Sequence, residues 1–281
     1  MNTVGSTMTD AVIIEEIPCK NGDGVIAKVT INRPDKLNSL NQEVMNSLKE
    51  MCSWADSNES IRCIIITGAQ PNPPPEGKRA KPNAFVAGAD ITEFVGKNSN
   101  DIREMFSDNA WEAIWNLSKP TIAMVDGFAL GGGCEVACSC DIRIASTRAA
   151  FGTPEIKLGL IPGGGGTQRL VNLVGLGKTM EMIYSGENIS ADEALKIGLA
   201  NHVVEPEELE GFTLNIAQSI AGKSLHTLRI AKQTIRAALE NGMSKGVAIE
   251  AEAFANLFDT EDKEIGVQAF LARESPIWKH K

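Results

Sequence analysis

No stretch of this 281-residue chain approaches the roughly 18 uninterrupted apolar residues that a membrane span requires. The chain also lacks a basic surplus, because its net charge is -9, whereas nucleic-acid binding depends on a basic surface that neutralises phosphates. Its first residues, MNTVGSTMTDAVIIEE, lack the basic start and apolar core of a secretory signal and the arginine content of a transit peptide. We therefore expect a cytoplasmic protein without a membrane or nucleic-acid partner.

Cysteine and histidine are scarce, and this scarcity bears on disulfides and metals. Six cysteines are too few for a disulfide framework in so long a chain, so we expect reduced thiols. Cys134, Cys138 and Cys140 form a C-x3-C-x-C cluster, but the cluster has no convincing fourth ligand, and none of the three histidines is near it in sequence. The pattern favours buried packing thiols over a metal site, and we expect no metal.

What is present is an ordinary globular composition, with 43% hydrophobic and 22% charged residues. Residues 11–20 and 25–32 are β-branched runs joined by Asn21-Gly22-Asp23-Gly24, which is typical of a hairpin turn. Apolar residues recur at helical spacing over residues 41–55, and the strand-like RCIIITG of residues 62–68 follows. The sequence therefore predicts a strand, strand, helix unit at the start of the chain.

A similar alternation returns further along the chain. Residues 84–88, 120–127 and 141–146 read as strands and residues 101–117 as one helix, which indicates an α/β fold. From residue 206 onward helical periodicity dominates and strand signals almost disappear. We therefore predict a core over residues 1–200 and a helical C-terminal section over residues 201–281.

The glycine runs do not match nucleotide-binding motifs. VGLGKT lacks the glycine that a Walker loop would need at position 172, which is Asn172, and PGGGGTQ at residues 162–168 lacks the dinucleotide-binding spacing. A glycine run between a strand and a helix can instead bring backbone close to a ligand and leave the first amides of the helix unpaired. In GFALGGGCEVACSC, residues 127–140, Glu135 would lie in the first helical turn. The residues of this stretch alone do not decide between two roles for Glu135: a catalytic base, or an acid that only stabilises its helix.

A second glutamate stands in an unusual setting. Glu155 follows Pro154 in a mainly apolar segment and precedes a glycine- and proline-rich turn. Two glutamates that face one ligand can divide acid and base duties when their environments differ. Spacing does not show that Glu135 and Glu155 meet, because 20 residues and a strand separate them.

Three motifs in order resemble the signature of the crotonase (enoyl-CoA hydratase/isomerase) superfamily. They are FVAGADI (residues 85–91), DGFALGGGCEVACSCDIRIAS (126–146) and FGTPEIKLGLIPGGGGTQRL (151–170), with similar ends in INRPDKLNSLN (31–41) and QAFLARESPIWKHK (268–281). The resemblance covers nearly the whole chain. It implies a spiral of strand, strand, helix units followed by a helical trimerisation section, assembled as a trimer or a dimer of trimers.

The resemblance also implies chemistry on an acyl-CoA thioester. Two backbone amides, at Ala89 and Gly132, would stabilise an enolate, and Glu135 and Glu155 match the two catalytic glutamates of the hydratases. Many isomerases and decarboxylases of the superfamily lack one of the two acids, so the pair favours reversible hydration of a short-chain 2-enoyl-CoA, of the crotonyl-CoA or 3-hydroxypropionyl-CoA type. CoA is then part of the substrate, and no cofactor is expected.

Further residues match CoA or substrate contacts of the family. By resemblance these are Lys36, Leu37, Ala87, Asp90, Ile91, Phe94, Gly163, Phe254, Phe270 and Arg273. Phe94 would wall the acyl pocket, which indicates short chains. The sequence departs from the family at Thr92, where hydratases often have lysine, and at Arg273, which replaces a lysine that reaches a neighbouring subunit's CoA.

The roles of some aromatic and basic residues have two possible interpretations. Phe254 and Phe270 match pocket or interface aromatics, but their helical setting favours plain core, and Trp111 and Trp115 also read as core. The loop of residues 70–83, with five prolines, carries Lys78, Arg79 and Lys81. These three are either phosphate contacts or, as we favour, solvated residues.

Three other functions compete with hydration. Within the family the rival is an enoyl-CoA isomerase or another enolate-forming enzyme. A non-catalytic subunit of an acyl-CoA complex is disfavoured by the intact pair of glutamates, and a nucleotide-binding protein is disfavoured by Asn172.

Overall fold

The computed structural model describes residues 5–281 and has a seven-stranded sheet as its centre. The strands lie in the order β1 (Gly5–Thr9), β2 (Val12–Pro18), β3 (Val25–Ile31), β4 (Ile61–Gly68), β6 (Thr121–Val125), β8 (Ile142–Ser146) and β11 (His202–Val204). The first three are antiparallel, and all later pairs are parallel. The expected α/β class and the expected first hairpin are therefore confirmed.

The hairpin turn forms as its chemistry predicts. Gly22 and Gly24 have φ values of 77° and 79°, which glycine adopts without a steric penalty. The side chain of Asn21 accepts the N–H of Asp23 at 3.1 Å, and the N–H of Cys19 donates to the Gly24 carbonyl at 3.0 Å. The turn thereby fixes the register of β2 on β3.

A second, smaller sheet has four strands. Its order is β10 (Ile189–Ser190), β9 (Ala150–Gly152), β7 (Phe128–Leu130) and β5 (Ala84–Val86), with β5, β7 and β9 parallel. Apart from the strand signal of residues 84–88, these strands have too little periodicity to be found from sequence. They matter because β5, β7 and β9 each lead into one of the three family motifs.

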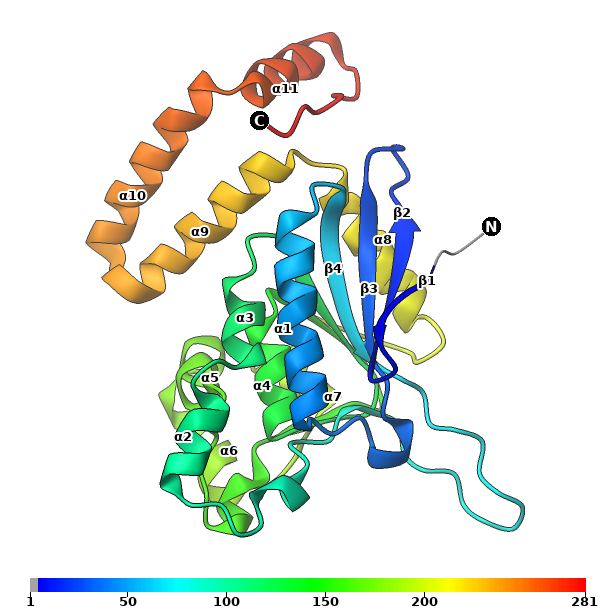
Figure 1. Cartoon of the computed structure of the whole chain (residues 1–281). Coiled ribbons are helices and arrows are strands. Elements are labelled where there is room, and N and C mark those ends of the chain that lie inside the picture. The colour runs from blue at the N-terminus through cyan, green and yellow to red at the C-terminus, as the bar shows by residue number, and fades with distance from the viewer. Residues whose placement is uncertain (1–4) are drawn as a thin grey trace.

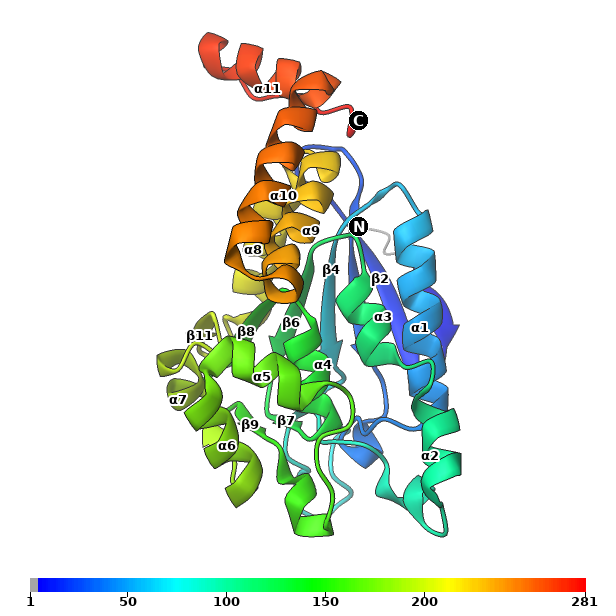
Figure 2. The same cartoon turned by 90° about the vertical axis from the view of Figure 1, so that its left-hand side faces the viewer.

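The main sheet is covered on both faces. Helices α1 (Gln42–Ser57), α3 (Ala110–Asn116) and α4 (Gly132–Ser139) pack on one face, and α8 (Leu209–Ala221) packs on the other (Figures 1 and 2). Strand β4 contributes residues to the cores on both faces of the sheet. Ile64 and Ile66 belong to the core under α1, α3 and α4, whereas Cys63 and Ile65 belong to the core under α8. This alternation follows from the two-residue period of a strand.

The single helix predicted over residues 101–117 is wrong, because the chain forms two helices there. α2 (Ser99–Phe106) ends before the polar residues 107–109, and α3 starts afterwards. The side chain of Asn109 accepts the N–H of Glu112 at 2.9 Å, which caps the start of α3. Apolar residues recur at helical spacing across the break, so periodicity alone predicts one continuous helix.

The helices α5 (Gly166–Val174), α6 (Leu176–Ser185) and α7 (Ala191–Lys196) complete the core. The predicted division at residue 200 stays a prediction, and β11 and α8, which follow that residue, pack with the main sheet. Beyond α8 the predicted helical section is confirmed. α9 (Leu225–Asn241) and α10 (Met243–Asn256) form a hairpin that extends from the core, with α11 (Glu261–Ala272) above it (Figure 1). We call residues 225–281 the helical arm.

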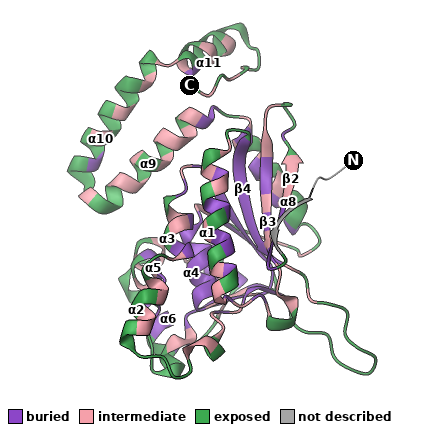
Figure 3. Ribbon diagram, viewed as in Figure 1, coloured by how far each residue is buried: buried purple, intermediate pink, exposed green. Residues whose placement is uncertain are grey.

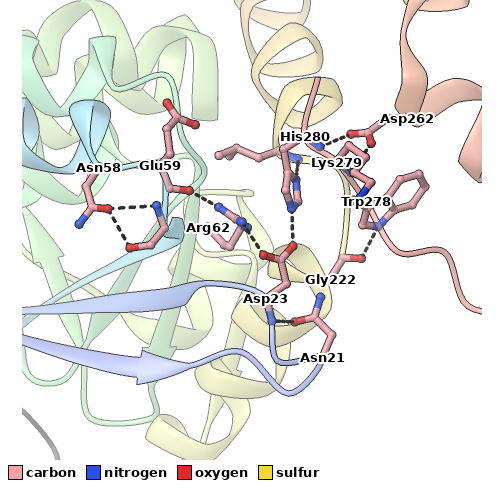
Figure 4. Close-up of polar contacts among 12 residues, drawn as sticks. Asn21, Asp23, Asn58, Glu59, Arg62, Gly222, Asp262, Trp278, Lys279 and His280 are labelled. Atoms are coloured by element: carbon pink, nitrogen blue, oxygen red, sulfur yellow. Dashed lines mark hydrogen bonds and ion pairs between the residues drawn. The ribbon is translucent and has the colours of Figure 1, made fainter.

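The end of the arm is tied back to the core (Figure 4). The buried carboxylate of Asp262 accepts the backbone N–H of His280 at 2.9 Å, and the indole of Trp278 donates to a carbonyl at 2.8 Å in the turn after α8. The His280 ring accepts the Leu225 N–H at 2.9 Å through Nδ1 and contacts Asp23 of the first hairpin through Nε2. These contacts fix the start of α9 and the last residues of the chain relative to the sheet.

No helix within residues 5–281 combines the length and apolar character needed to cross a membrane.

Candidate active site

The start of α4 is the centre of the site, and glycine is required there. Gly131 has φ 50° and ψ −125°, a conformation that side chains disfavour. Its N–H donates to the Gly152 carbonyl on β9 at 2.9 Å, and its own carbonyl accepts the N–H of Glu135 at 3.0 Å. A side-chain carbon on Gly133 would lie 2.0 Å from the Val86 carbonyl oxygen of β5. All eight residues of α4 are buried (Figure 3), so this helix is held from every side.

Two amides are neighbours at this point. The N–H groups of Ala89 and Gly132 have no acceptor within residues 5–281, and a side-chain carbon on Gly132 would lie 3.6 Å from the Ala89 nitrogen. Backbone bonds hold Ala89 on both sides: Leu40 donates to the Gly88 carbonyl at 2.9 Å and accepts the Asp90 N–H at 2.7 Å. The structure thus brings close together the two amides that the resemblance paired.

Glu135 is a buried carboxylate with a fixed orientation. Its residue is 2% exposed, and Oε1 accepts the N–H groups of Gly164 at 2.7 Å and Gly166 at 2.8 Å. The pKa of Glu135 is raised to about 7, because burial and then the negative charge of Glu155 raise it more than the two amides and Arg169 lower it. A carboxylate with a pKa near neutrality suits proton transfer at physiological pH.

Glu155 has a different environment. It lies on a short 3-10 helix, Pro154–Leu158, and is half-buried. Oε2 is buried without a hydrogen-bond partner among the described residues, and burial raises the pKa of this carboxyl. Oε1 would lie 2.9 Å from a side-chain carbon on Gly131. Glu155 therefore lies beside the same turn from which Glu135 projects, which the sequence spacing left open.

The glycine run after Glu155 has a role that sequence reasoning missed. The sequence predicts only a turn at Gly164 and Gly166, yet their amides hold Glu135. Buried Arg169 donates to the Gly164 carbonyl at 2.6 Å and to Glu112 at 2.5 Å, so it fixes this run from the other side. A signal was present, since four consecutive glycines directly before a helix leave several unpaired amides.

A small cavity of about 20 Å³ adjoins Ala89. Its apolar lining includes Leu40, Met45, Phe94, Phe106 and Trp111. Such a volume is little more than the ~10 to 15 Å³ that one water needs. Phe94, expected at the acyl pocket, is part of this lining, and the contributions of Phe106 and Trp111 were not predicted.

Several expected CoA contacts lie on one side of the Ala89 turn. Lys36 is exposed at the end of a 3-10 helix, Pro34–Lys36, and the Leu37 carbonyl accepts the Ala87 N–H at 3.1 Å. Ile91 is 54% exposed. These residues surround an accessible edge of the turn, and their contact with CoA stays a prediction.

Asp90 and Thr92 form a local polar cluster next to this edge. The Thr92 hydroxyl donates to Asp90 at 2.7 Å, and Arg33 pairs with Asp90 at 3.1 Å. The Thr92 hydroxyl, and then Arg33, lower the pKa of Asp90. Thr92, which departs from the family's usual lysine, thus stabilises the ionised Asp90.

Gly163 is exposed, and a side-chain carbon there would lie 3.2 Å from the Phe106 ring.

The prediction that Phe254 and Phe270 are ordinary core residues is wrong. Their exposed fractions are 64% and 83%, because they lie on α10 and α11 of the extended arm. Arg273 ends α11 and is exposed as well. α11 lies at the opposite end of the molecule from α2 and α6 in both views (Figures 1 and 2). Helical periodicity could not show this, because an apolar stripe looks the same whether the chain's own core or a partner covers it.

The two tryptophans of α3 differ from each other. Trp111 is buried, 3% exposed, as expected. Trp115 is only partly buried, so the core reading is wrong for it: its ring lies between Arg169, 5.0 Å from the centroid, and Arg236 of α9, at 3.9 Å. This arrangement is a cation–π contact between the core and the arm.

The six cysteines are buried free thiols, as expected of packing residues. The loop of residues 70–83 extends from the molecule (Figure 1), and Lys78 and Arg79 are exposed. Lys81 donates to the Asp35 carbonyl at 2.8 Å, which places it beside Lys36.

Comparisons with known proteins agree with this geometry. The family model described as "Enoyl-CoA hydratase/isomerase" matches residues 21–281. A short-chain-enoyl-CoA hydratase of Clostridium acetobutylicum is 42% identical over 253 residues, which cover 89% of this chain and 93% of that protein. A crotonyl-CoA hydratase of Syntrophomonas wolfei is 39% identical over 88% of this chain and 92% of its own. The crystal structure of an enoyl-CoA hydratase from Bacillus anthracis superposes with a TM-score of 0.83 at 33% identity, covering 100% of both chains.

The chain therefore belongs to the enoyl-CoA hydratase/isomerase family. The predicted fold and the predicted class of enzyme are confirmed at this level.

Proposed function

We propose that the protein is a reversible short-chain enoyl-CoA hydratase that uses Glu135 and Glu155 as its acid–base pair. One observation carries the proposal: two carboxylates with raised pKa values lie beside one turn, where the amides of Gly132 and Ala89 are neighbours without an acceptor among the described residues. The names of the relatives from Clostridium acetobutylicum and Syntrophomonas wolfei support the same reaction.

In the proposed mechanism the thioester oxygen accepts the N–H groups of Ala89 and Gly132. Charge then flows from the double bond to this oxygen, so that C3 becomes electrophilic and an enolate forms as the C3–O bond is made. The ionised Glu135 takes a proton from the attacking water, and the protonated Glu155 delivers a proton to C2. In dehydration the two roles are exchanged.

The environments of the two acids fit these roles. Two amide donors fix Oε1 of Glu135 and partly oppose the rise of its pKa, so that the carboxylate can take up a proton near neutral pH. Oε2 of Glu155 has no donor among the described residues, and burial raises the pKa of this carboxyl, so Glu155 can hold the proton that the proposed reaction transfers to C2. Two carboxyl groups that avoid simultaneous ionisation share one proton, and the reaction needs this state at its start.

We further propose a short acyl chain. The cavity beside Ala89 has a volume of about 20 Å³, and its lining includes Phe94, Phe106 and Met105. A substituent much longer than the methyl group of crotonyl-CoA would have to displace these side chains.

The CoA moiety is proposed to lie along the exposed edge that Lys36, Leu37 and Ala87 form. Lys81 borders this edge, so the loop of residues 70–83 is a candidate for phosphate contacts. Substitution of Lys78, Arg79 and Lys81 by glutamine should raise KM for CoA substrates about threefold. An unchanged KM would leave the loop as a solvated segment.

We propose that the arm mediates assembly into a trimer or a pair of trimers. Exposed apolar residues along the arm, including Ile235, Met243, Phe254 and Phe270, are a basis for such contacts. Sedimentation of the full chain tests this proposal, and a monomer at micromolar concentration would exclude it.

The function is tested by hydration of crotonyl-CoA, followed by the loss of enoyl-thioester absorbance and in reverse from 3-hydroxybutyryl-CoA. Longer enoyl-CoA substrates test the proposed chain length. A 3-enoyl-CoA converted to its 2-enoyl isomer, without hydration of either, would favour an isomerase. CoA binding without any turnover would favour a non-catalytic subunit.

A further inference from the structure

We propose that Trp111 is a positioning residue that aims the Gly132 amide at the thioester oxygen, an inference that rests on the proposed function. The indole Nε1–H of Trp111 donates to the Gly132 carbonyl at 2.9 Å. Trp111 lies on α3 and is 3% exposed, so water competes little for this bond. Its role is indirect, because the donor to substrate is the backbone and not the indole.

The need for such a residue follows from the glycine backbone. Gly132 lacks a Cβ, so its two peptide planes turn more freely than those of other residues. The plane before it is fixed because the Gly131 carbonyl accepts the Glu135 N–H at 3.0 Å. The plane after it carries the carbonyl that Trp111 holds. The Gly132 N–H lies in the first of these planes, which the bond from Glu135 holds. The bond from Trp111 holds the second plane and so restricts rotation about the Gly132 Cα, which keeps the first plane in place.

The indole ring also contacts the backbone that holds Glu135. A side-chain carbon on Gly132 would lie 3.1 Å from Cζ2 of Trp111, and one on Gly164 would lie 2.4 Å from Cδ2. Gly164 donates its N–H to Glu135 at 2.7 Å. One ring therefore separates the oxyanion amide from the cradle of the carboxylate and sets the distance between them.

The position of Trp111 is itself well defined. Its ring stacks on Phe106, with centroids 5.4 Å apart, and Asn109 caps the start of the same helix. The next residue, Glu112, pairs with Arg169, which in turn holds the Gly164 carbonyl. The short helix α3 thus contacts both halves of the site through adjacent residues.

The test replaces the N–H donor and keeps the ring. We would compare Trp111→Phe with a variant that carries 3-benzothienylalanine at position 111, in which sulfur replaces the indole N–H with little change of shape. Trp54→Phe is the matched control, since Trp54 is a partly buried tryptophan on α1 that packs against the same core. Each protein is assayed for kcat and KM with crotonyl-CoA, for Tm, and for the red shift of the infrared carbonyl band of bound butyryl-CoA, which reports carbonyl polarisation.

We expect both Trp111 variants to lose roughly tenfold to hundredfold in kcat, since small misplacements of catalytic groups have effects of this size. KM should change less than about threefold, because the interaction matters most in the transition state. The red shift should shrink in both variants and stay intact in the control.

A benzothienylalanine variant with the wild-type kcat and red shift would overturn the inference, even if its Tm were lower. A wild-type protein that binds butyryl-CoA with a red shift but does not hydrate crotonyl-CoA would contradict the proposed function only, and the shift would still test Trp111. A wild-type protein that does not bind the ligand would overturn both.

Discussion

Glu135 and Glu155 lie on the two sides of one turn, but the backbone around them differs. Glu135 projects from the first turn of a buried α-helix and accepts two amides from a glycine run. Glu155 lies on a short 3-10 helix at the edge of the core, and one of its oxygens has no partner among the described residues. The difference teaches that backbone hydrogen bonds can give two carboxylates beside one turn different environments.

The largest expected effect comes from removing either carboxylate. Glu135→Gln and Glu155→Gln should each lower kcat for crotonyl-CoA hydration about 10²- to 10⁴-fold, the usual contribution of a general acid or base. Glutamine keeps the shape, so Tm should change little relative to kcat. Undiminished hydration by either variant would remove that residue from the mechanism.

The second effect concerns the pH dependence of stability that Glu135, the more deeply buried of the two acids, should cause. The folded-state pKa of Glu135 is about 7, above the ordinary glutamate pKa of 4.5, so between these pH values the folded protein keeps a proton that the unfolded chain has lost. This contribution to the free energy of unfolding is fully present below pH 4.5 and is lost as pH rises through about 7. It amounts to about 3 kcal/mol.

Chemical denaturation of wild type and Glu135→Gln at a series of pH values isolates this contribution. Relative to the variant, the wild type should lose stability between pH 4.5 and about 7. Parallel curves for the two proteins across this range would show that burial does not raise the pKa of Glu135.

A third change acts mainly on Glu155, the less deeply buried of the two acids. Gly131→Ala would place a carbon 2.9 Å from Oε1 of Glu155, at a φ of 50°. We expect kcat to fall roughly tenfold to hundredfold, because Glu155 must shift. Gly175→Ala is the control for backbone strain, since Gly175 also has positive φ but no neighbour within 4 Å. Equal losses in both variants would contradict the role of the Glu155 contact.

The smallest effect concerns the acyl pocket. Phe106→Ala should enlarge the cavity beside Ala89 and raise kcat/KM for octenoyl-CoA relative to crotonyl-CoA about tenfold. Met180→Ala, on the exposed part of α6, serves as a control that leaves the ratio unchanged. An unchanged ratio in Phe106→Ala would place the acyl chain elsewhere.

Much of the fold and the positions of the main site residues could be predicted from sequence. The hairpin, the core helices and the glycine turn before Glu135 are local features, so residue types and spacing are sufficient. The break between α2 and α3, the amides that hold Glu135 and the bond from Trp111 to Gly132 were not found. Each depends on contacts between segments far apart in sequence or on competition between a cap and a continuing helix. The exposure of Phe254 and Phe270 was also missed, since periodicity does not identify what covers an apolar face.

The most direct test of the division between the two acids is exchange of the C2 protons of butyryl-CoA in deuterated water, followed by NMR. This substrate has no double bond to hydrate, so only the acid that transfers a proton at C2 is needed. The account predicts that Glu135→Gln retains exchange and that Glu155→Gln loses it. Exchange that survives in Glu155→Gln and disappears in Glu135→Gln would contradict the assignment.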